Sequence, residues 1–213
     1  MEWGASGAGT VTEGTEKIPV QPPAENPGKE SAENDLRTLL AEMKGRANEV
    51  PIYVRYLRTG TEFERTRAAE ALGEIGDAGA VQPLIDALSD PSSTVQYLAA
   101  KSLGSFHDPR AVDPLIGKLR SESKWVRRAS AETLGKLGDA RAVDPLIFLL
   151  GDPKHDVRAH AAEALGRLGK TRAIEPLKAL LADTSEDVRK EARAALEKLE
   201  GVPAPVPDAS IHA

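Results

Sequence analysis

Cysteine is absent from this chain of 213 residues, and aromatic residues make up only 4% of it. Without cysteine, the chain can form neither a disulfide framework nor a thiolate metal site. So few aromatic residues, beside abundant alanine and leucine, favour closely packed helices over a bulky globular core.

The sequence also lacks a strong charge of one sign and a long apolar run. Its net charge is −5, and charges of both signs alternate along the chain, so no broad basic field is available for nucleic acid or anionic lipid. No apolar stretch approaches the roughly 20 residues that a membrane helix needs, and residues 1–20 contain no basic segment followed by an apolar one. We therefore expect a soluble cytoplasmic protein that does not bind membranes.

What the sequence does contain is a repeat with an offset of 31 residues. A Leu-Gly step and a Pro-Leu step recur in register. The two sets of steps are Leu72-Gly73, Leu103-Gly104, Leu134-Gly135 and Leu165-Gly166, and Pro83-Leu84, Pro114-Leu115, Pro145-Leu146 and Pro176-Leu177. A fixed period of this length, with apolar positions kept and others free, is typical of a solenoid of stacked helical units.

The spacing predicts two helices in each unit, one short and beginning near a proline, one longer. The predicted helix pairs span 49–75, 79–105, 110–137, 141–168 and 172–200. Before them, Leu36, Leu39, Leu40 and Met43 lie on one stripe, which predicts a capping helix over 32–45. Residues 1–31 and the proline-rich 201–213 have too few apolar side chains to bury, so we expect two disordered tails.

Aspartates stand just before three of the longer helices. We expect Asp90, Asp152 and Asp183 to be the N-caps, with Pro91 and Pro153 at the first helical position. Asp183 and Glu186 have the spacing of a capping box.

The repeated glycine after leucine calls for a physical cause, because glycine inside a helix costs about 1 kcal/mol relative to alanine. We expect Gly73, Gly104, Gly135 and Gly166 to let a neighbouring helix approach closely. In the last unit Glu197 and Arg193 replace a glycine and an alanine, so the solenoid should end near residue 200.

These features resemble HEAT repeats, and in particular the short HEAT-like repeats of phycobilisome lyases. The marks of the resemblance are Asp and Arg six residues apart (Asp152 and Arg158, Asp183 and Arg189) and the three Val-Arg steps Val126-Arg127, Val157-Arg158 and Val188-Arg189. This chain departs from the pattern at Gln96, Ser121 and Lys170. The resemblance implies an all-α, right-handed α–α solenoid whose longer helices line a concave face.

One stripe of each longer helix changes freely from unit to unit, as a solvent-facing or partner-facing surface does. Aromatic residues and arginine, which often anchor protein interfaces, occur on this stripe. The candidate partner-binding residues are Phe63, Tyr97, Lys101, Trp125, Arg128 and Glu132. The alternative is that Phe63 and Trp125 simply pack over the loops between helices.

We therefore predict a non-catalytic scaffold or adaptor that needs no cofactor and binds another protein. An enzyme role is the first alternative. Phycobilin lyase subunits share these repeats, but act with a partner subunit and a tetrapyrrole. HEAT-like deoxyhypusine hydroxylase binds iron through His-Glu dipeptides, and none stands at the matching positions here; His160 and Glu163 could contact a metal only as an isolated pair.

Nucleic-acid binding through the groove is the second alternative. The segment around Lys118, Arg120, Lys124 and Arg128 is locally basic, but Glu70 and other carboxylates would oppose phosphates on the same face.

Overall fold

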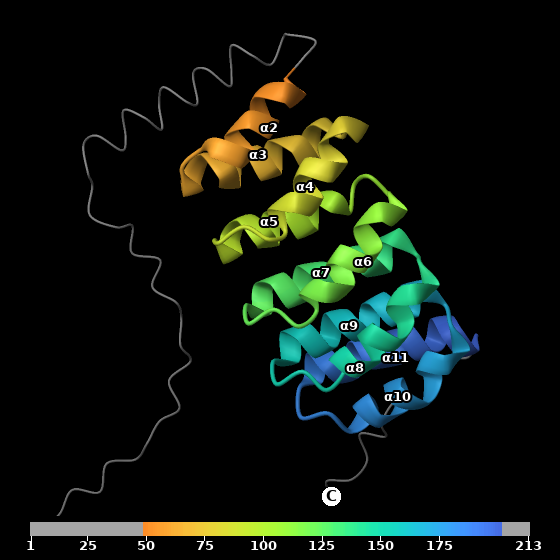
Figure 1. The fold of residues 1–213 in the computed structure, drawn as a ribbon. Helices are drawn as coiled ribbons and strands as arrows, with labels where there is room; N and C mark the ends of the chain where they lie inside the picture. The colour runs from red at the N-terminus through yellow and green to blue at the C-terminus, as the bar shows by residue number, and fades with distance from the viewer. Residues whose placement is uncertain (1–48, 202–213) are drawn as a thin grey trace, which may run out of the picture. The chain divides into compact units, whose positions relative to one another are not determined.

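A computed structural model describes residues 49–201 of the chain. Within that range the secondary structure is entirely helical and no strand occurs (Figure 1). The predicted all-α solenoid is therefore confirmed. The predicted capping helix over 32–45 and the two predicted tails lie outside the described residues, except that Gly201 ends the last helix.

Five helix pairs follow one another, and we call them units 1 to 5. Unit 1 comprises α2 (Val50–Thr59) and α3 (Glu62–Ile75), and unit 2 comprises α4 (Val81–Ala87) and α5 (Ser93–Leu103). Units 3 to 5 comprise α6 (Val112–Lys118) with α7 (Lys124–Leu137), α8 (Val143–Leu149) with α9 (His155–Leu168), and α10 (Ile174–Ala179) with α11 (Glu186–Glu200). A short 3₁₀ turn leads into each of α4, α6, α8 and α10, and a further one, Leu180–Ala182, follows α10.

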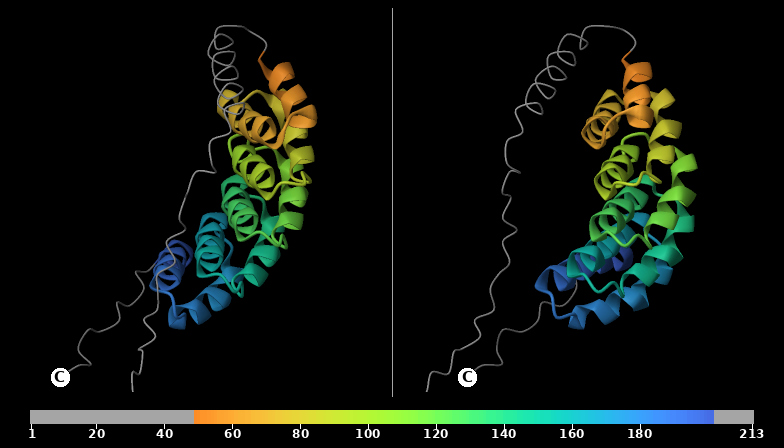
Figure 2. Two further views of the ribbon diagram at one scale, coloured as in Figure 1. Left: turned by 90° about the vertical axis from the view of Figure 1, so that its left-hand side faces the viewer. Right: turned by 60° about the vertical axis from the view of Figure 1, so that its left-hand side comes forward.

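The units stack in two curved layers. In Figure 2 the shorter helices form the outer, convex layer, and the longer helices form the inner layer on the concave side. Each unit lies next to the units before and after it in the sequence. Contacts between residues that are distant in the described sequence are therefore contacts between neighbouring units.

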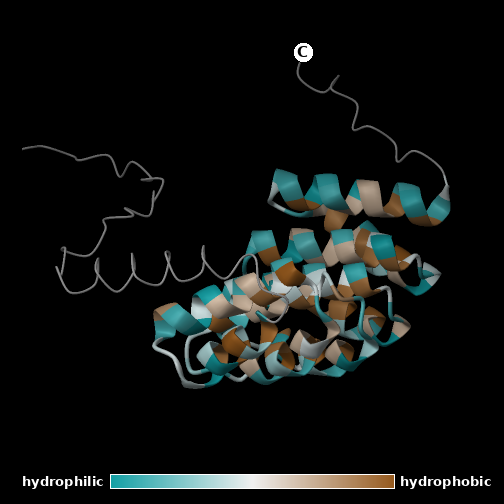
Figure 3. Ribbon diagram, turned by 90° about the horizontal axis from the view of Figure 1, so that it is seen from above, coloured by the Kyte–Doolittle hydropathy of each residue, from teal (hydrophilic) through white to brown (hydrophobic). Residues whose placement is uncertain are grey.

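The core lies between the two layers and repeats with the sequence. The eight leucines of the Leu-Gly and Pro-Leu steps are all fully buried: Leu72, Leu84, Leu103, Leu115, Leu134, Leu146, Leu165 and Leu177. Figure 3 shows apolar residues where neighbouring helices face each other and hydrophilic residues on the outside. Truncation of one such leucine to alanine typically costs about 2–5 kcal/mol, so this column carries much of the stability.

The glycine after leucine does allow close approach between long helices. A Cβ atom added at Gly135 would lie 2.8 Å from the Cα of Ala164, and one at Gly166 would lie 2.9 Å from the Cα of Ala195. Both distances are far below normal contact. At Gly104 the neighbours are more distant, with 3.4 Å to Thr133 Oγ1. The predicted cause of the repeated glycine is confirmed, with Gly104 as the loosest case.

The prediction that Asp90, Asp152 and Asp183 are N-caps is wrong. The caps of the helices that follow them are Ser92, Lys154 and Ser185, two residues later, and Pro91 and Pro153 lie before the helices. Each aspartate accepts a hydrogen bond from the backbone N–H of that cap residue, at 2.8–2.9 Å, and so forms a turn ahead of the helix. Asp183 and Glu186 therefore form no capping box; Thr61 and Glu64 form one instead.

The same aspartates join successive units. An arginine of one long helix forms an ion pair with the aspartate that precedes the next long helix, and we call these the long-helix ion pairs. They are Arg65–Asp90 at 2.6 Å, Arg127–Asp152 at 2.6 Å and Arg158–Asp183 at 2.8 Å. The arginine six residues after an aspartate instead donates to that aspartate's main-chain carbonyl, as Arg158 does to Asp152 at 2.8 Å.

Candidate functional site

The six predicted site residues lie on three successive long helices of the inner layer. Phe63 lies in the first turn of α3, Tyr97 and Lys101 belong to α5, and Trp125, Arg128 and Glu132 belong to α7. Phe63 is 40% exposed and Trp125 is 42% exposed. Both rings are therefore partly accessible, whether or not they also pack over the loops between helices.

Trp125 is the best-defined member of the set. The ammonium nitrogen of Lys124 lies 4.6 Å from the centre of its ring, and the guanidinium carbon of Arg128 lies 4.8 Å from it. Contacts of this kind stabilise a ring orientation by about 0.5–1 kcal/mol at exposed sites. The indole is therefore positioned by its neighbours while two fifths of its surface stays accessible.

The Arg128 side chain, beside Trp125, contains one nitrogen atom without a hydrogen-bond partner. Its Nε is buried and has no hydrogen-bond partner among the described residues. Buried donors are nearly always paired in folded proteins, so an unpaired one within a candidate surface is a useful observation. Because this atom is buried in the free chain, a partner could bond to it only after the Arg128 side chain moved.

Glu132 is already engaged with its own helix. Its carboxylate forms an ion pair with Lys136, one turn further along α7, with 2.7 Å between Oε1 and Nζ. Partial burial raises the pKa of Glu132, but the Lys136 hydrogen bond and the charges of Lys136, His160 and Arg167 outweigh burial, so the pKa lies below its ordinary value. Glu132 therefore stays ionised and shapes the charge of the surface.

The structure brings some of the predicted residues together and leaves others apart. Trp125 and Arg128 touch, and Glu132 follows one turn later on the same stripe of α7. Tyr97 and Lys101 lie on the neighbouring helix α5, and Phe63 lies on α3, one helix further away. The centre of the candidate surface is therefore α5 and α7, with Phe63 at its N-terminal end.

One hollow on the long helices lies outside the set of partner-binding residues predicted from sequence. A hollow of about 300 Å³ lies between α9 and α11, and its lining comprises His155, Asp156, Ala159, His160, Glu163, Asp187, Lys190 and Glu191. The sequence signal is Ala159, which is the smallest residue in a column that otherwise holds Thr66, Tyr97, Arg128 and Lys190. A small side chain at that position leaves the space open.

The predicted pair of His160 and Glu163 is occupied by local contacts. His160 Nδ1 donates to the carbonyl of Asp156 at 2.8 Å, and Glu163 accepts from Arg167 at 2.7 Å. Over residues 49–201, no three or more His, Asp or Glu side chains are grouped so that they could hold a metal ion. Across the same range, no helix combines the length and the apolar character needed to span a bilayer.

The family described as HEAT repeats matches residues 54–132 and 112–197, which together include parts of units 1 and 5 and all of units 2 to 4. No curated protein matches the chain in sequence.

Several solved structures share the fold. A chain in the complex of CpcE and CpcF of phycocyanin lyase from Nostoc sp. PCC7120 is 27% identical, with a TM-score of 0.67 over 74% of this chain and 67% of that one. An engineered protein is 26% identical, with a TM-score of 0.61 over 71% of this chain and 79% of its own. A designed armadillo repeat protein shares the fold at 22% identity and a TM-score of 0.62, over 82% of this chain and 95% of its own.

Proposed function

Because this chain belongs to the HEAT-repeat family, we propose that it is a non-catalytic scaffold or adaptor that binds another protein on its concave face. The proposed anchors are Tyr97, Trp125 and Arg128, with Lys101 and Glu132 beside them and Phe63 at one end. Fold alone does not imply function, so the proposal depends on the residues of this surface.

The observation that carries the proposal is the state of Trp125. An indole that is 42% exposed and already held by Lys124 and Arg128 loses little conformational freedom when a partner covers it. Trp, Tyr and Arg are the residue types that most often dominate binding energy at protein interfaces.

The charges on this face favour a protein over nucleic acid. Basic residues are interleaved with acidic ones and paired to them, as in Lys124–Asp156 at 3.4 Å and Lys136–Glu132 at 2.7 Å. Phosphate backbones require several lysines and arginines that are free to replace counterions. Mixed and paired charges instead suit the polar rim of a protein interface.

The test is affinity capture from an extract of the cells that make the protein. Three baits are compared: the intact chain, the Tyr97→Ala/Trp125→Ala variant, and a Phe148→Ala control. Phe148 suits the control because it is an aromatic residue, 78% exposed, on α8 of the outer layer. We expect one protein to be retained by the intact chain and the control and lost by the double variant, with all three equally helical by circular dichroism.

Two outcomes would contradict the proposal. Equal retention of the same proteins by all three baits would remove the concave face as the site. Retention of nucleic acid alone would indicate that the groove binds nucleic acid and not a protein.

A lyase-subunit role is the second candidate, and its support is the similarity to the CpcE and CpcF complex. In that case the chain would act together with a second subunit, as in that complex, and on a tetrapyrrole. The discriminating measurement is the visible absorption of the chain mixed with a linear tetrapyrrole, with and without the captured protein. A shifted band only in the presence of both proteins would favour this candidate over a scaffold.

A further inference from the structure

The junction between units 2 and 3 differs from the others among the described residues. Long-helix ion pairs cross from unit 1 to 2, from 3 to 4 and from 4 to 5. At the corresponding positions between units 2 and 3 stand Gln96 and Ser121. Gln96 keeps only the bond within its own unit, from Nε2 to the carbonyl of Asp90 at 2.6 Å.

A second set of ion pairs joins the 3₁₀ turn of one unit to the short helix of the unit before it; this set is missing between units 2 and 3, as it is between units 1 and 2, where Gly79 and Pro51 stand at the matching positions. Arg141 reaches Asp113 of unit 3 at 2.7 Å, and Arg172 reaches Asp144 of unit 4 at 2.6 Å. The matching residues between units 2 and 3 are Arg110 and Gln82. Arg110 turns back to Asp108 at 2.8 Å, two residues before it.

Unit 2 also ends irregularly. Glycines in the left-handed conformation end α3, α7, α9 and α11, whereas the position after α5 that matches Gly76 and Gly138 is His107. His107 adopts a φ of 52°, the one positive φ of a non-glycine residue in the described chain. Such a conformation is strained for a residue with a Cβ atom. α5 itself stops at Leu103 and is shorter than the other long helices.

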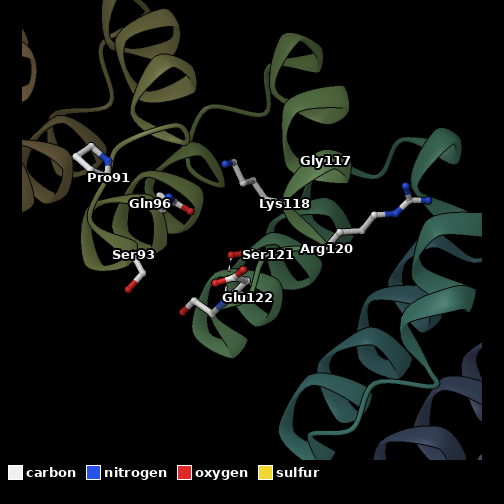
Figure 4. Close-up of a pocket in the computed structure, with 9 residues that line it drawn as sticks. Pro91, Ser93, Gln96, Gly117, Lys118, Arg120, Ser121 and Glu122 are labelled. Carbon is white, nitrogen blue, oxygen red and sulfur yellow. Dashed lines mark hydrogen bonds between the residues drawn. The ribbon is translucent and has the colours of Figure 1, made fainter.

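An open hollow of about 470 Å³ lies at this junction. Figure 4 shows Gln96 of α5 on one side of it, and Ser121 and Glu122 on the other. The ammonium group of Lys118 extends into the gap toward α5, while Arg120 points away. Where the other junctions have an arginine and an aspartate in contact, this junction has space.

What joins units 2 and 3 is the buried core between α5 and α7. The hydrogen bond that crosses the junction within residues 49–201 runs from Thr133 Oγ1 to the carbonyl of Ala100, at 2.8 Å and buried. The close approach at Gly104 is looser than at Gly135 or Gly166. A junction held by its apolar core and one buried hydrogen bond, with no ion pair at either edge, should resist bending less than the junctions that also have ion pairs.

We propose that the solenoid bends at the junction of units 2 and 3, and that this bending adjusts the concave binding surface. Tyr97 and Lys101 lie on α5, on one side of the junction, and Trp125 and Arg128 lie on α7, on the other. A change of angle between the two units therefore changes the spacing of the anchors. The consequence for binding rests on the proposed function, whereas the bending itself does not.

The test is a distance measurement by pulsed electron paramagnetic resonance on the full chain. Because the chain contains no cysteine, introduced cysteines are the only attachment points for spin labels. One pair, Ser89→Cys with Gly151→Cys, spans the junction; a matched pair, Arg120→Cys with Ala182→Cys, lies one unit further along and does not. All four residues are exposed.

We expect the distance distribution of the spanning pair to be about twofold broader than that of the matched pair. A clamped variant supplies the missing ion pairs through Gln96→Arg, Ser121→Asp and Gln82→Asp. In it, the spanning pair should narrow to the width of the matched pair.

Equal widths in the unclamped chain would overturn the proposal. A spanning pair that stays broad in a folded clamped variant would overturn the assignment of bending to the missing ion pairs. If the clamped variant fails to fold, the comparison of the two label pairs in the unclamped chain still decides the question. No partner takes part, so this result is independent of the capture experiment.

Discussion

The guanidinium of Arg158 in unit 4 donates two hydrogen bonds to the carboxylate of Asp183, which lies just before α11 of unit 5. Both contacts, Nε to Oδ2 and Nη2 to Oδ1, measure 2.8 Å, and the remaining nitrogen Nη1 donates to the carbonyl of Asp152 at 2.8 Å. One arginine therefore ties together the turn before its own helix and the turn before the next. The geometry is bidentate, and only 15% of the arginine side chain and 9% of the aspartate side chain are exposed.

Asp183→Asn should destabilise the fold by about 2 kcal/mol, because it leaves the Arg158 guanidinium without its charged partner in a largely buried place. The matched control is Asp144→Asn. Asp144 also pairs with an arginine of the next unit, Arg172, but both side chains are about two thirds exposed. Such a pair contributes less than about 1 kcal/mol. Urea unfolding followed by circular dichroism measures both, and equal losses would contradict the ranking.

Acid should weaken the same contact. The hydrogen bond from Arg158, together with the backbone N–H of Ser185 and the nearby arginine charges, outweighs burial and holds the pKa of Asp183 below its ordinary value of 3.8. A lowered pKa means that the contribution is fully present above 3.8 and is lost as the pH falls through the folded-state pKa. The unfolding free energy of the intact chain should therefore fall more steeply below pH 3.8 than that of Asp183→Asn. Parallel curves would show that Asp183 does not couple to folding.

Gly135→Ala should cost about 2 kcal/mol, because the added methyl would overlap the Cα and Cβ of Ala164 on the next long helix. Gly117→Ala is the control. That glycine lies near the end of α6, and no atom beyond its chain neighbours and the backbone of its own helix lies within 4 Å of the added methyl, so alanine should stabilise by about 0.5 kcal/mol. Opposite signs in thermal unfolding are expected. A stabilising effect at both positions would mean that the helices separate easily.

Ser130→Ala should stabilise the protein by about 1 kcal/mol. Ser130 is fully buried and its hydroxyl has no hydrogen-bond partner among the described residues. The other four units hold alanine at this position: Ala68, Ala99, Ala161 and Ala192. A lower unfolding free energy in the variant would mean that the hydroxyl has a partner in solution.

The buried positions that recur every 31 residues could be predicted from the sequence, because the packing around them also repeats. Leu134 and Gly135 have the same neighbours in kind as Leu165 and Gly166, so a fixed period reports a fixed contact. The aspartates were harder. Asp152 has the residue type and position of an N-cap, and only the structure shows that its carboxylate serves an arginine 25 residues earlier and a turn instead.

Variation between units marked the candidate surface but not its shape. Trp125, Arg128 and Tyr97 stood out as residue types, whereas the contact of two cations with one ring depends on rotamers that spacing does not specify. The hollow beside Ala159 and the open junction at Gln96 and Ser121 are spaces that the side chains of two neighbouring units leave empty. Such spaces depend on pairs of positions in different units, which one column read by itself does not reveal.

The measurement that tests the central claim most directly is the dissociation constant of a captured protein for the intact chain, Trp125→Ala and Phe148→Ala. If Trp125 anchors the concave face, its loss should weaken binding by about 30-fold or more, equivalent to about 2 kcal/mol, while Phe148→Ala changes it less than about twofold. Affinity that survives Trp125→Ala and falls with Phe148→Ala would place the partner on the outer layer and contradict the account.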